Sequence, residues 1–282
     1  MSLVSYPAPA KLNLFLRVTG RRADGYHLLQ TVFRFIDFGD TLYFRIRQDG
    51  VIRRVNSVPG IPADEDIVVK AARLLRHEAG VSRGIEIRVR KRLPVGGGLG
   101  GGSSDAATVL LALNRIWGLH LKRRDLEALG LRLGADVPVF IFGESAFAEG
   151  IGEKLRPVAL PPRWYLVLVP PVMVTTRKVF EHPDLTRNST PVTMSAFSAV
   201  KGQNDLEAVV CSTYPDVGRH LDWLRARVGE AGVAALTGSG ACLFAEFSTE
   251  EEARRLASLL PPTMHGFVAQ GLDRHPLRRL AD

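Results

Sequence analysis

The feature that most limits how this chain can fold is a run of glycines near its middle. Six of the seven residues from Gly96 to Gly102 are glycine, and Ser103 and Ser104 follow directly. The alternating stretch 85–89 before the run predicts a strand, and the apolar spacing of 105–117 after it predicts a helix. Because glycine has no Cβ atom, consecutive backbone N–H groups of such a loop approach a ligand closely, at the positive end of a helix. The pattern predicts a polyphosphate-binding loop, and a flexible loop with a serine helix cap is the alternative.

The familiar phosphate loops do not fit this run. A Walker A loop needs Gly-Lys-Ser/Thr, and no lysine lies between Gly96 and Ser104. Gly96, Gly98 and Gly101 satisfy G-x-G-x-x-G, but the dinucleotide fold then requires a strand that ends in an acidic residue, whereas 124–133 reads as a helix. The protein-kinase loop needs a Val-Ala-Ile-Lys strand and a His-Arg-Asp loop, and the chain contains neither.

The length and composition indicate a globular chain with two domains. It has 282 residues, of which 46% are hydrophobic and 23% charged. The proline-rich stretch 157–162 is the best linker candidate, so we expect an N-terminal domain over 1–158 and a C-terminal domain over 159–282. Strands and helices mix without strict alternation, which predicts an α+β fold with sheet-and-helix layers.

Several locations and partner classes are disfavoured. No apolar run reaches the roughly 20 residues that span a bilayer, and Lys11 and Arg17 interrupt any signal-like segment, so we expect a cytoplasmic protein without a membrane partner. Cys211 and Cys242 form no disulfide or zinc pattern and are expected to be buried. The net charge of +8 is spread in short pairs without an RNA-binding aromatic signature, so we expect no nucleic-acid partner.

Hydrophobic spacing predicts the remaining elements. Residues 10–18 alternate as in a half-buried strand, and two β-rich runs, 31–38 and 41–46, are separated by Gly39 and Asp40. A helix is expected after an Asp66 N-cap, with Gly80 as its stop. In the second half the pattern predicts strands at 165–169, 241–247 and near Gly266, and helices near Asp205 and over 216–228 and 249–260.

The loop and its flanks resemble the GHMP small-molecule kinases, which include galactokinase, homoserine kinase and mevalonate kinase. The segment 94–104 is similar to their central phosphate loop, and Pro-Ala-Pro-Ala-Lys-Leu-Asn at 7–13 and Leu-Thr-Gly-Ser-Gly-Ala-Cys at 236–242 flank it in the expected order. The resemblance covers nearly the whole chain. It implies the two-domain GHMP kinase fold, with an N-terminal ribosomal-protein-S5-like ATP-binding domain and a C-terminal α/β sandwich domain.

Within that family, Gly-Tyr-His at 25–27 and Leu-Gly-Ala-Asp-Val-Pro at 133–138 are most similar to one group of members. Those members phosphorylate the 2-hydroxyl group of 4-diphosphocytidyl-2-C-methyl-D-erythritol with ATP, in the non-mevalonate isoprenoid pathway. The resemblance therefore implies ATP and Mg²⁺ as cofactors, small-molecule substrates, and a monomer or weak homodimer.

The resemblance also implies roles for individual residues. Asp136 matches the family's catalytic aspartate and would accept the hydroxyl proton, while Lys11 would keep it ionised. Judged alone, Asp136 reads as a turn or capping residue and Lys11 as a solvent-facing strand residue. The residues expected to bind ATP are Lys91, Pro94, Gly96, Gly97, Gly98, Leu99, Gly100, Gly101, Gly102, Ser103, Ser104 and Asp66. The residues expected to bind the second substrate are Asn13, Tyr26, His27, Phe180, Gly238 and Ser239.

Two positions depart from the family pattern, because Asp66 and Asp105 stand where asparagine is often seen. The sequence identifies no protein ligands for the metal. Two rival functions stay open. A GHMP kinase for another alcohol, such as mevalonate or homoserine, is disfavoured because those substrates carry no base for Tyr26 and His27 to bind. A binding protein for nucleic acid or a regulatory nucleotide is disfavoured because Lys11 and Asp136 are both present.

Overall fold

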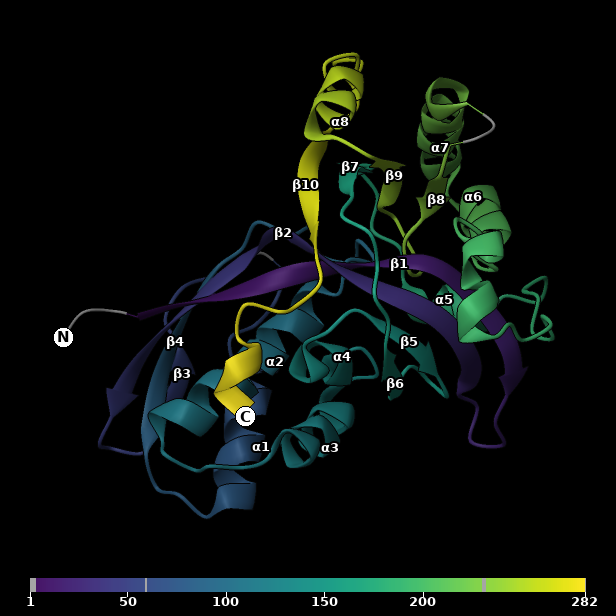
Figure 1. Cartoon of the computed structure of the whole chain (residues 1–282). Helices are drawn as coiled ribbons and strands as arrows, with labels where there is room; N and C mark the ends of the chain where they lie inside the picture. The colour runs from purple at the N-terminus through teal and green to yellow at the C-terminus, as the bar shows by residue number, and fades with distance from the viewer. Residues whose placement is uncertain (1–3, 59, 230–231, 282) are drawn as a thin grey trace.

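The computed structural model describes residues 4–58, 60–229 and 232–281. These residues form a mixed α and β structure around a long twisted sheet, which confirms the α+β expectation (Figure 1). The strands are β1 Val4–Arg21, β2 His27–Arg47, β3 Ile52–Arg54, β4 Gly84–Arg90, β5 Ala146–Glu149, β6 Lys154–Pro157, β7 Trp164–Leu168, β8 Ala234–Leu236, β9 Leu243–Phe247 and β10 Gly266–Leu272. The helices are α1 Ile67–Ala79, α2 Gly101–Ile116, α3 Arg123–Leu133, α4 Val137–Phe142, α5 Thr176–Glu181, α6 Glu207–Thr213, α7 Pro215–Val228 and α8 Glu250–Ala257, with 3₁₀ turns at Met194–Val200 and Arg278–Ala281.

The two longest strands, β1 and β2, form an antiparallel hairpin that runs through the middle of the molecule. The prediction that Gly39 and Asp40 separate two strands was wrong, because β2 continues through both residues. The register shifts beside Pro9 at this point, and a Cβ atom on Gly39 would lie 2.2 Å from the Ala8 carbonyl oxygen. Glycine is therefore required here by the close approach of two backbones, which is a bulge rather than a strand end.

Residues 8–16 of β1 are buried on both faces of the strand, so the prediction of a half-buried strand was also wrong. Leu12 and Leu14 pack in the central core, while Lys11 and Asn13 on the other face are only 2% and 3% exposed. The polar face is covered by residues far along the chain: the backbone N–H of Asn13 donates to Thr237 Oγ1 at 3.0 Å. Period-two alternation shows which residues share a face but not what covers that face.

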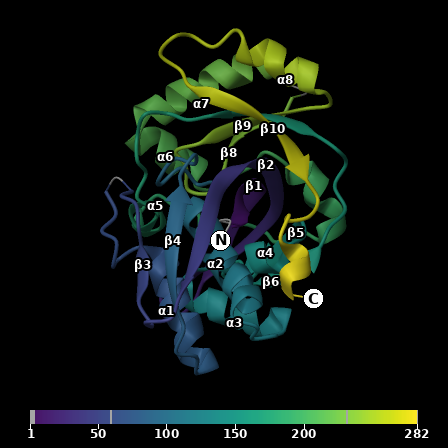
Figure 2. The ribbon, with the colours of Figure 1, turned by 90° about the vertical axis from the view of Figure 1, so that its left-hand side faces the viewer.

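In the first half of the chain, helices α1 to α4 pack on one face of the sheet. Ile85, Ile87 and Val89 of β4 join the same apolar core as these helices. Figures 1 and 2 show the helices together on that side of the long strands. Helix α4 was not predicted, because its six residues are all apolar and too few to show a helical period.

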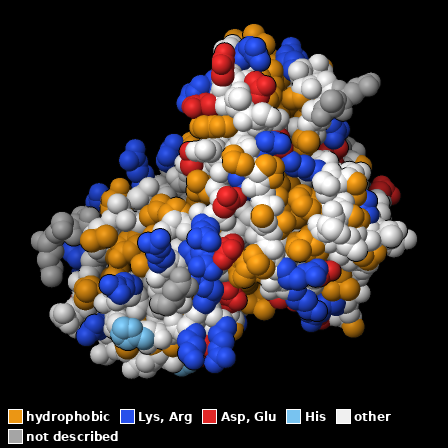
Figure 3. Space-filling model, in the orientation of Figure 1, with side chains coloured by type: hydrophobic (Ala, Val, Ile, Leu, Met, Phe, Trp, Pro, Cys, Tyr) orange, Lys and Arg blue, Asp and Glu red, His pale blue; other side chains and the backbone are white. Residues whose placement is uncertain are grey.

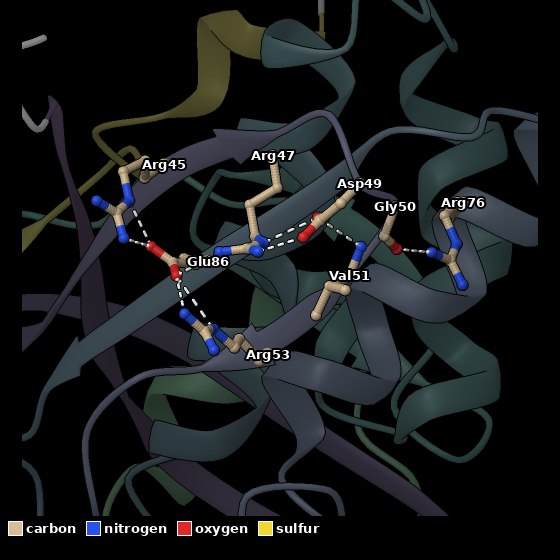
Figure 4. A network of polar contacts seen from close by, with 8 residues as sticks. All are labelled: Arg45, Arg47, Asp49, Gly50, Val51, Arg53, Arg76 and Glu86. Carbon is tan, nitrogen blue, oxygen red and sulfur yellow. Dashed lines mark hydrogen bonds and ion pairs between the residues drawn. The ribbon is translucent and has the colours of Figure 1, made fainter.

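The opposite face of β4 carries a network of polar contacts around Glu86 (Figure 4). The Glu86 carboxylate accepts hydrogen bonds from Arg47 Nη1 at 2.9 Å and Arg53 Nε at 3.0 Å, and it also pairs with Arg45. These contacts, led by Arg53, hold the pKa of Glu86 near 2 although burial opposes the shift. Because the three arginines come from β2 and β3, the network ties three strands together on their outer surface.

The second half adds four strands and its own helices. The main path of the sheet runs β3-β4-β2-β10-β7-β9-β8, so β10 joins the two halves by pairing with both β2 and β7. The expected boundary near residue 158 stays a prediction. The expected strand at 241–247 is shorter, since β9 begins at Leu243. Strands β3, β5 and β6 and helix α5 were not predicted, and each has six residues or fewer.

Three further expectations concern the surface and composition. Cys242 is buried as expected, whereas Cys211 is only partly buried, and both are free thiols. No helix of residues 4–58, 60–229 and 232–281 is long and apolar enough to cross a membrane. On the face shown in Figure 3, lysine and arginine side chains are spread over both lobes, among acidic and apolar neighbours.

Candidate active site

The glycine run forms the start of helix α2 as well as the loop before it. The N-cap is Gly100, with φ at +71°, and Ser104 N already donates to Gly100 O at 2.8 Å. The expectation that the helix begins at Asp105 was therefore wrong by one turn, and neither Ser103 nor Ser104 is the cap. The cause is that glycine is a poor helix former, so sequence propensity hides a first turn that tertiary contacts stabilise.

The loop rests directly on a turn from the second half of the chain. Cys242 N donates to Gly97 O at 3.0 Å, and Ala241 N donates to Gly96 O at 3.3 Å. Gly98 has φ at +74°, and a Cβ atom there would lie 2.2 Å from Thr237 O. The two backbones touch at this point, so the loop and the turn behave as one surface.

A cavity of about 510 Å³ opens beside this surface. Most of the predicted site residues line it: Lys11, Asn13, Asp66, Lys91, Pro94, Gly96, Gly97, Gly98, Leu99, Gly100, Gly101, Gly102, Ser103, Asp136, Phe180, Gly238 and Ser239. Three predicted residues are not part of its wall. Ser104 is fully buried inside the helix packing, and Tyr26 and His27 lie outside the lining. The structure thus brings together residues that are up to 228 positions apart.

Lys11 and Asp136 meet in the lining of the cavity. Lys11 Nζ lies 3.3 Å from Asp136 Oδ2, and it donates to Asn13 Oδ1 at 2.6 Å and to Gly98 O at 2.9 Å. The lysine side chain is 3% exposed and the aspartate side chain 37%. Asp136 occupies the N-cap position of α4, yet its side chain makes no capping hydrogen bond. A fixed buried cation therefore stands beside a carboxylate that is open to a ligand.

Asn13 is held in place by its neighbours on both sides. Its amide Nδ2 donates to Thr31 Oγ1 at 2.9 Å, and its Oδ1 accepts from Lys11. Thr31 is a functional residue that sequence reasoning missed. The only signal was its place in β2, the strand that pairs with β1, and strand register is not readable from a motif.

Lys91 is anchored between two carboxylates beside the glycine loop. Its Nζ donates to Asp105 Oδ2 at 2.9 Å and also pairs with Asp40, whose other oxygen accepts from Leu93 N at 2.9 Å. Burial opposes the charged amine, but Asp105 and Asp40 raise the pKa of Lys91 overall. Burial raises the pKa of Asp105 to about 8 although Lys91 opposes the shift. Sequence reasoning missed Asp40, which no motif contains.

Asp66 both caps a helix and lines the cavity. Its carboxylate accepts from Val68 N at 3.0 Å, as the N-cap prediction required, and it pairs with Arg54 Nη1 at 3.1 Å. Asp105, the other departure from the family pattern, lies inside α2 and caps nothing. Each of the two aspartates is therefore contacted by a cationic side chain that the chain itself supplies.

Aromatic and hydroxyl side chains from the second half of the chain also line the cavity. Phe180 on α5 lies against His27, with ring centroids 5.0 Å apart. Ser239 Oγ is 2.7 Å from Thr176 Oγ1. Tyr26, beside His27 in the chain, is 58% exposed. The structure thus brings His27 and Phe180 together as a pair and leaves Tyr26 on the surface.

Two family descriptions match this chain. "GHMP kinases N terminal domain" covers residues 66–144, which include the glycine loop, Lys91 and Asp136, and "GHMP kinases C terminal" covers residues 178–261. The chain belongs to the GHMP kinase family. It is therefore a small-molecule kinase that uses ATP as a substrate, which confirms the resemblance read from the sequence.

Individual relatives are similar to this kinase over almost their full length. It is 61% identical to 4-diphosphocytidyl-2-C-methyl-D-erythritol kinase of Nitrosospira multiformis, over 99% of this chain and 95% of the relative. It is 60% identical to the enzyme of the same name from Thiobacillus denitrificans, over 97% of both chains. A crystal structure of 4-(cytidine 5'-diphospho)-2C-methyl-D-erythritol kinase superimposes with a TM-score of 0.79 at 35% identity, covering 95% of this chain and 99% of that chain. A mevalonate kinase structure, at 15% identity and a TM-score of 0.71, shares the fold alone.

Proposed function

We propose that this kinase transfers the γ-phosphoryl group of ATP to the 2-hydroxyl group of 4-diphosphocytidyl-2-C-methyl-D-erythritol. The observation that carries the proposal is the 61% identity to a relative of that name over 99% of this chain. The cavity supports it, since it offers a helix terminus suited to phosphate, a buried cation beside an open carboxylate, and the ring of Phe180, which lies against His27 just outside the lining.

The residues that line the cavity come from both halves of the chain. Between residues 58 and 95, ahead of the glycine loop, they include apolar side chains that would suit a purine ring. These are Val58, Ile61, Ile67, Val89 and Val95. The second half contributes Phe180 and Ser239 among others. We infer that ATP binds at the glycine loop against the first group and the cytidylyl substrate against the second, so that the reacting groups meet at Lys11 and Asp136.

Phosphoryl transfer asks the protein mainly to position groups and to stabilise charge. The backbone N–H groups at the start of α2 would hold the phosphates of ATP. Asp136 would accept the proton of the attacking hydroxyl, and Lys11 Nζ, 3.3 Å away, would stabilise negative charge on the transferred group. Because Asn13 and Gly98 already hold Lys11, this charge needs no rearrangement during the reaction.

We infer that Mg²⁺ enters with ATP. In the described ranges no group of three or more His, Cys, Asp or Glu side chains could hold a metal ion. Mg²⁺ bound to a nucleotide needs only one or two protein oxygens, and it neutralises the phosphate charge. Asp66 and Asp105 are engaged by Arg54 and Lys91, and Asp136 is the proposed base, so the Ser103 hydroxyl on the cavity wall is the protein oxygen that would hold it.

A substrate panel tests the proposed function. ADP release with Mg²⁺-ATP is measured for diphosphocytidyl-methylerythritol, mevalonate, homoserine and galactose. We expect turnover with the cytidylyl substrate alone. Turnover with another alcohol would be consistent with ATP binding at the glycine loop but would refute the proposed acceptor substrate. Absence of turnover, together with steeply salt-dependent binding to RNA or DNA, would favour the binding-protein alternative.

The domain division at residues 158 and 159, the cytoplasmic location, and a monomer or weak homodimer without nucleic-acid or membrane partners stay predictions. A sedimentation experiment on the full chain checks the oligomeric state. A single species of 30.9 kDa is expected at low concentration.

A further inference from the structure

The side chain of Arg187 uses all of its donors inside the structure. A guanidinium has five N–H groups. Nε donates to His27 Nε2 at 3.2 Å. Nη1 donates to the carbonyl oxygens of Leu185 at 3.0 Å and Pro183 at 3.4 Å, and Nη2 donates to those of Phe180 at 3.0 Å and His182 at 2.7 Å. The planar fork is thus fixed in one orientation.

Arg187 is not a surface ion-pair residue. Among the residues that the structure describes, no carboxylate pairs with it, and its partners are four neutral carbonyls and an imidazole. It therefore organises the segment 180–187 around itself. It also touches both members of the aromatic pair, since it bonds the Phe180 backbone and the His27 ring.

The contact fixes which nitrogen of His27 carries the proton. A guanidinium has no acceptor, so Nε2 must present its lone pair to Arg187. Burial and the charges of Arg187 and Arg21 lower the pKa of His27, which keeps the ring neutral near pH 7. A neutral imidazole with a free Nε2 lone pair carries its proton on Nδ1. No described residue hydrogen-bonds Nδ1. His27 is not itself part of the cavity wall, but its ring centroid lies 5.0 Å from that of Phe180, which lines the cavity, so a base seated against Phe180 would lie close to the imidazole.

We propose that Arg187 is a positioning residue that holds His27 as an Nδ1–H donor for the base of the acceptor substrate. The inference rests on the proposed function. Cytosine offers lone pairs at N3 and O2, whereas uracil carries N–H at N3. A fixed N–H donor forms a hydrogen bond with the N3 lone pair of cytosine, whereas it meets a second N–H donor at N3 of uracil. Arg187 would thereby help the site to choose cytosine over uracil without touching the base itself.

The first test reads the tautomer directly and needs no turnover. Two-bond ¹⁵N–¹H correlations are recorded at pH 7.5 on the full chain with ¹⁵N-labelled histidine, and His27 is assigned by its loss in His27→Gln. We expect the Nδ1–H form in the unsubstituted protein. In Arg187→Met the Nε2–H form should gain population, because nothing then holds that lone pair. An Nε2–H form in the unsubstituted protein would overturn the proposal.

The second test separates positioning from general damage. Arg187→Lys keeps the charge but loses the fork, and Arg254→Lys, at an exposed ion pair on α8, is the matched control. A lost hydrogen bond of this kind is worth about tenfold in affinity. We expect Arg187→Lys to raise KM for the cytidylyl substrate about tenfold, to leave KM for ATP and kcat within about twofold, and to narrow the preference over the uridylyl analogue. Equal changes in both KM values, or none, would contradict the proposal.

The two tests also distinguish this inference from the function on which it rests. If the protein does not phosphorylate the cytidylyl substrate at all, the proposed function fails while the tautomer measurement still reports whether Arg187 controls His27. If turnover is normal and the tautomer is Nε2–H, only the role of Arg187 fails.

Discussion

Replacement of Gly98 by alanine would disturb the point where the phosphate loop meets the turn from the second half of the chain. Gly98 has φ at +74°, a conformation that costs an L-residue about 1–2 kcal/mol. Its new Cβ atom would also lie 2.2 Å from Thr237 O, so one of the two backbones must move. Relief of such overpacking costs typically about 1–3 kcal/mol. The expected loss in the free energy of unfolding is therefore about 2–5 kcal/mol.

Gly118→Ala is the matched control for this substitution. Gly118 has nearly the same conformation, with φ at +68°, but an added Cβ there meets no atom within 4 Å. It should lose only the conformational part, about 1–2 kcal/mol. The difference in melting temperature between the two variants therefore measures the cost of the contact with Thr237. In a chain of this size each kcal/mol lowers the melting temperature by about 2–4 °C.

The same displacement should reach the chemistry. A shift of about 1 Å in groups that position the reacting atoms costs about 100-fold in rate. We expect kcat/KM to fall by that order in Gly98→Ala and to stay within about twofold in Gly118→Ala. If the two variants match in both melting temperature and kcat/KM, the close contact between the loop and the turn does not exist as described.

Three further substitutions have measurable consequences. In the folded state Asp105 keeps its proton from the ordinary pKa of 3.8 up to about 8. The contribution of Asp105 to the stability of the fold therefore falls as pH rises through that window. Asp105→Asn should raise the melting temperature more at pH 8 than at pH 5, and an equal rise at both pH values would refute the pKa shift. Burial lowers the pKa of His275 to about 3, so the contribution of His275 to the stability of the fold is present above pH 6.5 and is lost as pH falls. Between pH 7 and pH 4 the melting temperature of His275→Gln should therefore fall less steeply than that of the unsubstituted protein. Thr31→Val removes the acceptor for Asn13 Nδ2 and should lower kcat/KM about tenfold, whereas an unchanged value would mean that Asn13 needs no such support.

The features that could be predicted from the sequence are those that depend on a particular residue type within a short segment of the chain. The glycine run marks a loop of the candidate site, and at Gly98 the backbone approaches Thr237 so closely that it tolerates no Cβ atom. Asp66 was recognised as a helix cap because its role depends on residues next to it in the chain. These signals are local, so one sequence is enough to read them.

What the sequence did not reveal depends on contacts between distant segments. Asp40 pairs with Lys91 across 51 positions, and His27 meets Arg187 across 160. Neither contact could be predicted from the spacing of its residues in the sequence. Only the folded structure places β2 beside β4 and the segment 180–187 beside the start of β2. The burial of Lys11 was missed for the same reason, because its Nζ lies against the Gly98 carbonyl and the turn at Gly238, which come later in the chain.

Phosphorus NMR of the reaction observes the proposed phosphoryl transfer itself. The full chain is mixed with Mg²⁺-ATP and diphosphocytidyl-methylerythritol, and the products are followed together with those of Asp136→Asn. The account predicts one new phosphomonoester resonance in step with ADP, located on the 2-hydroxyl by its coupling to the adjoining carbons, and a rate at least about 100-fold lower in the variant. ADP without that resonance, or an equal rate in Asp136→Asn, would contradict it.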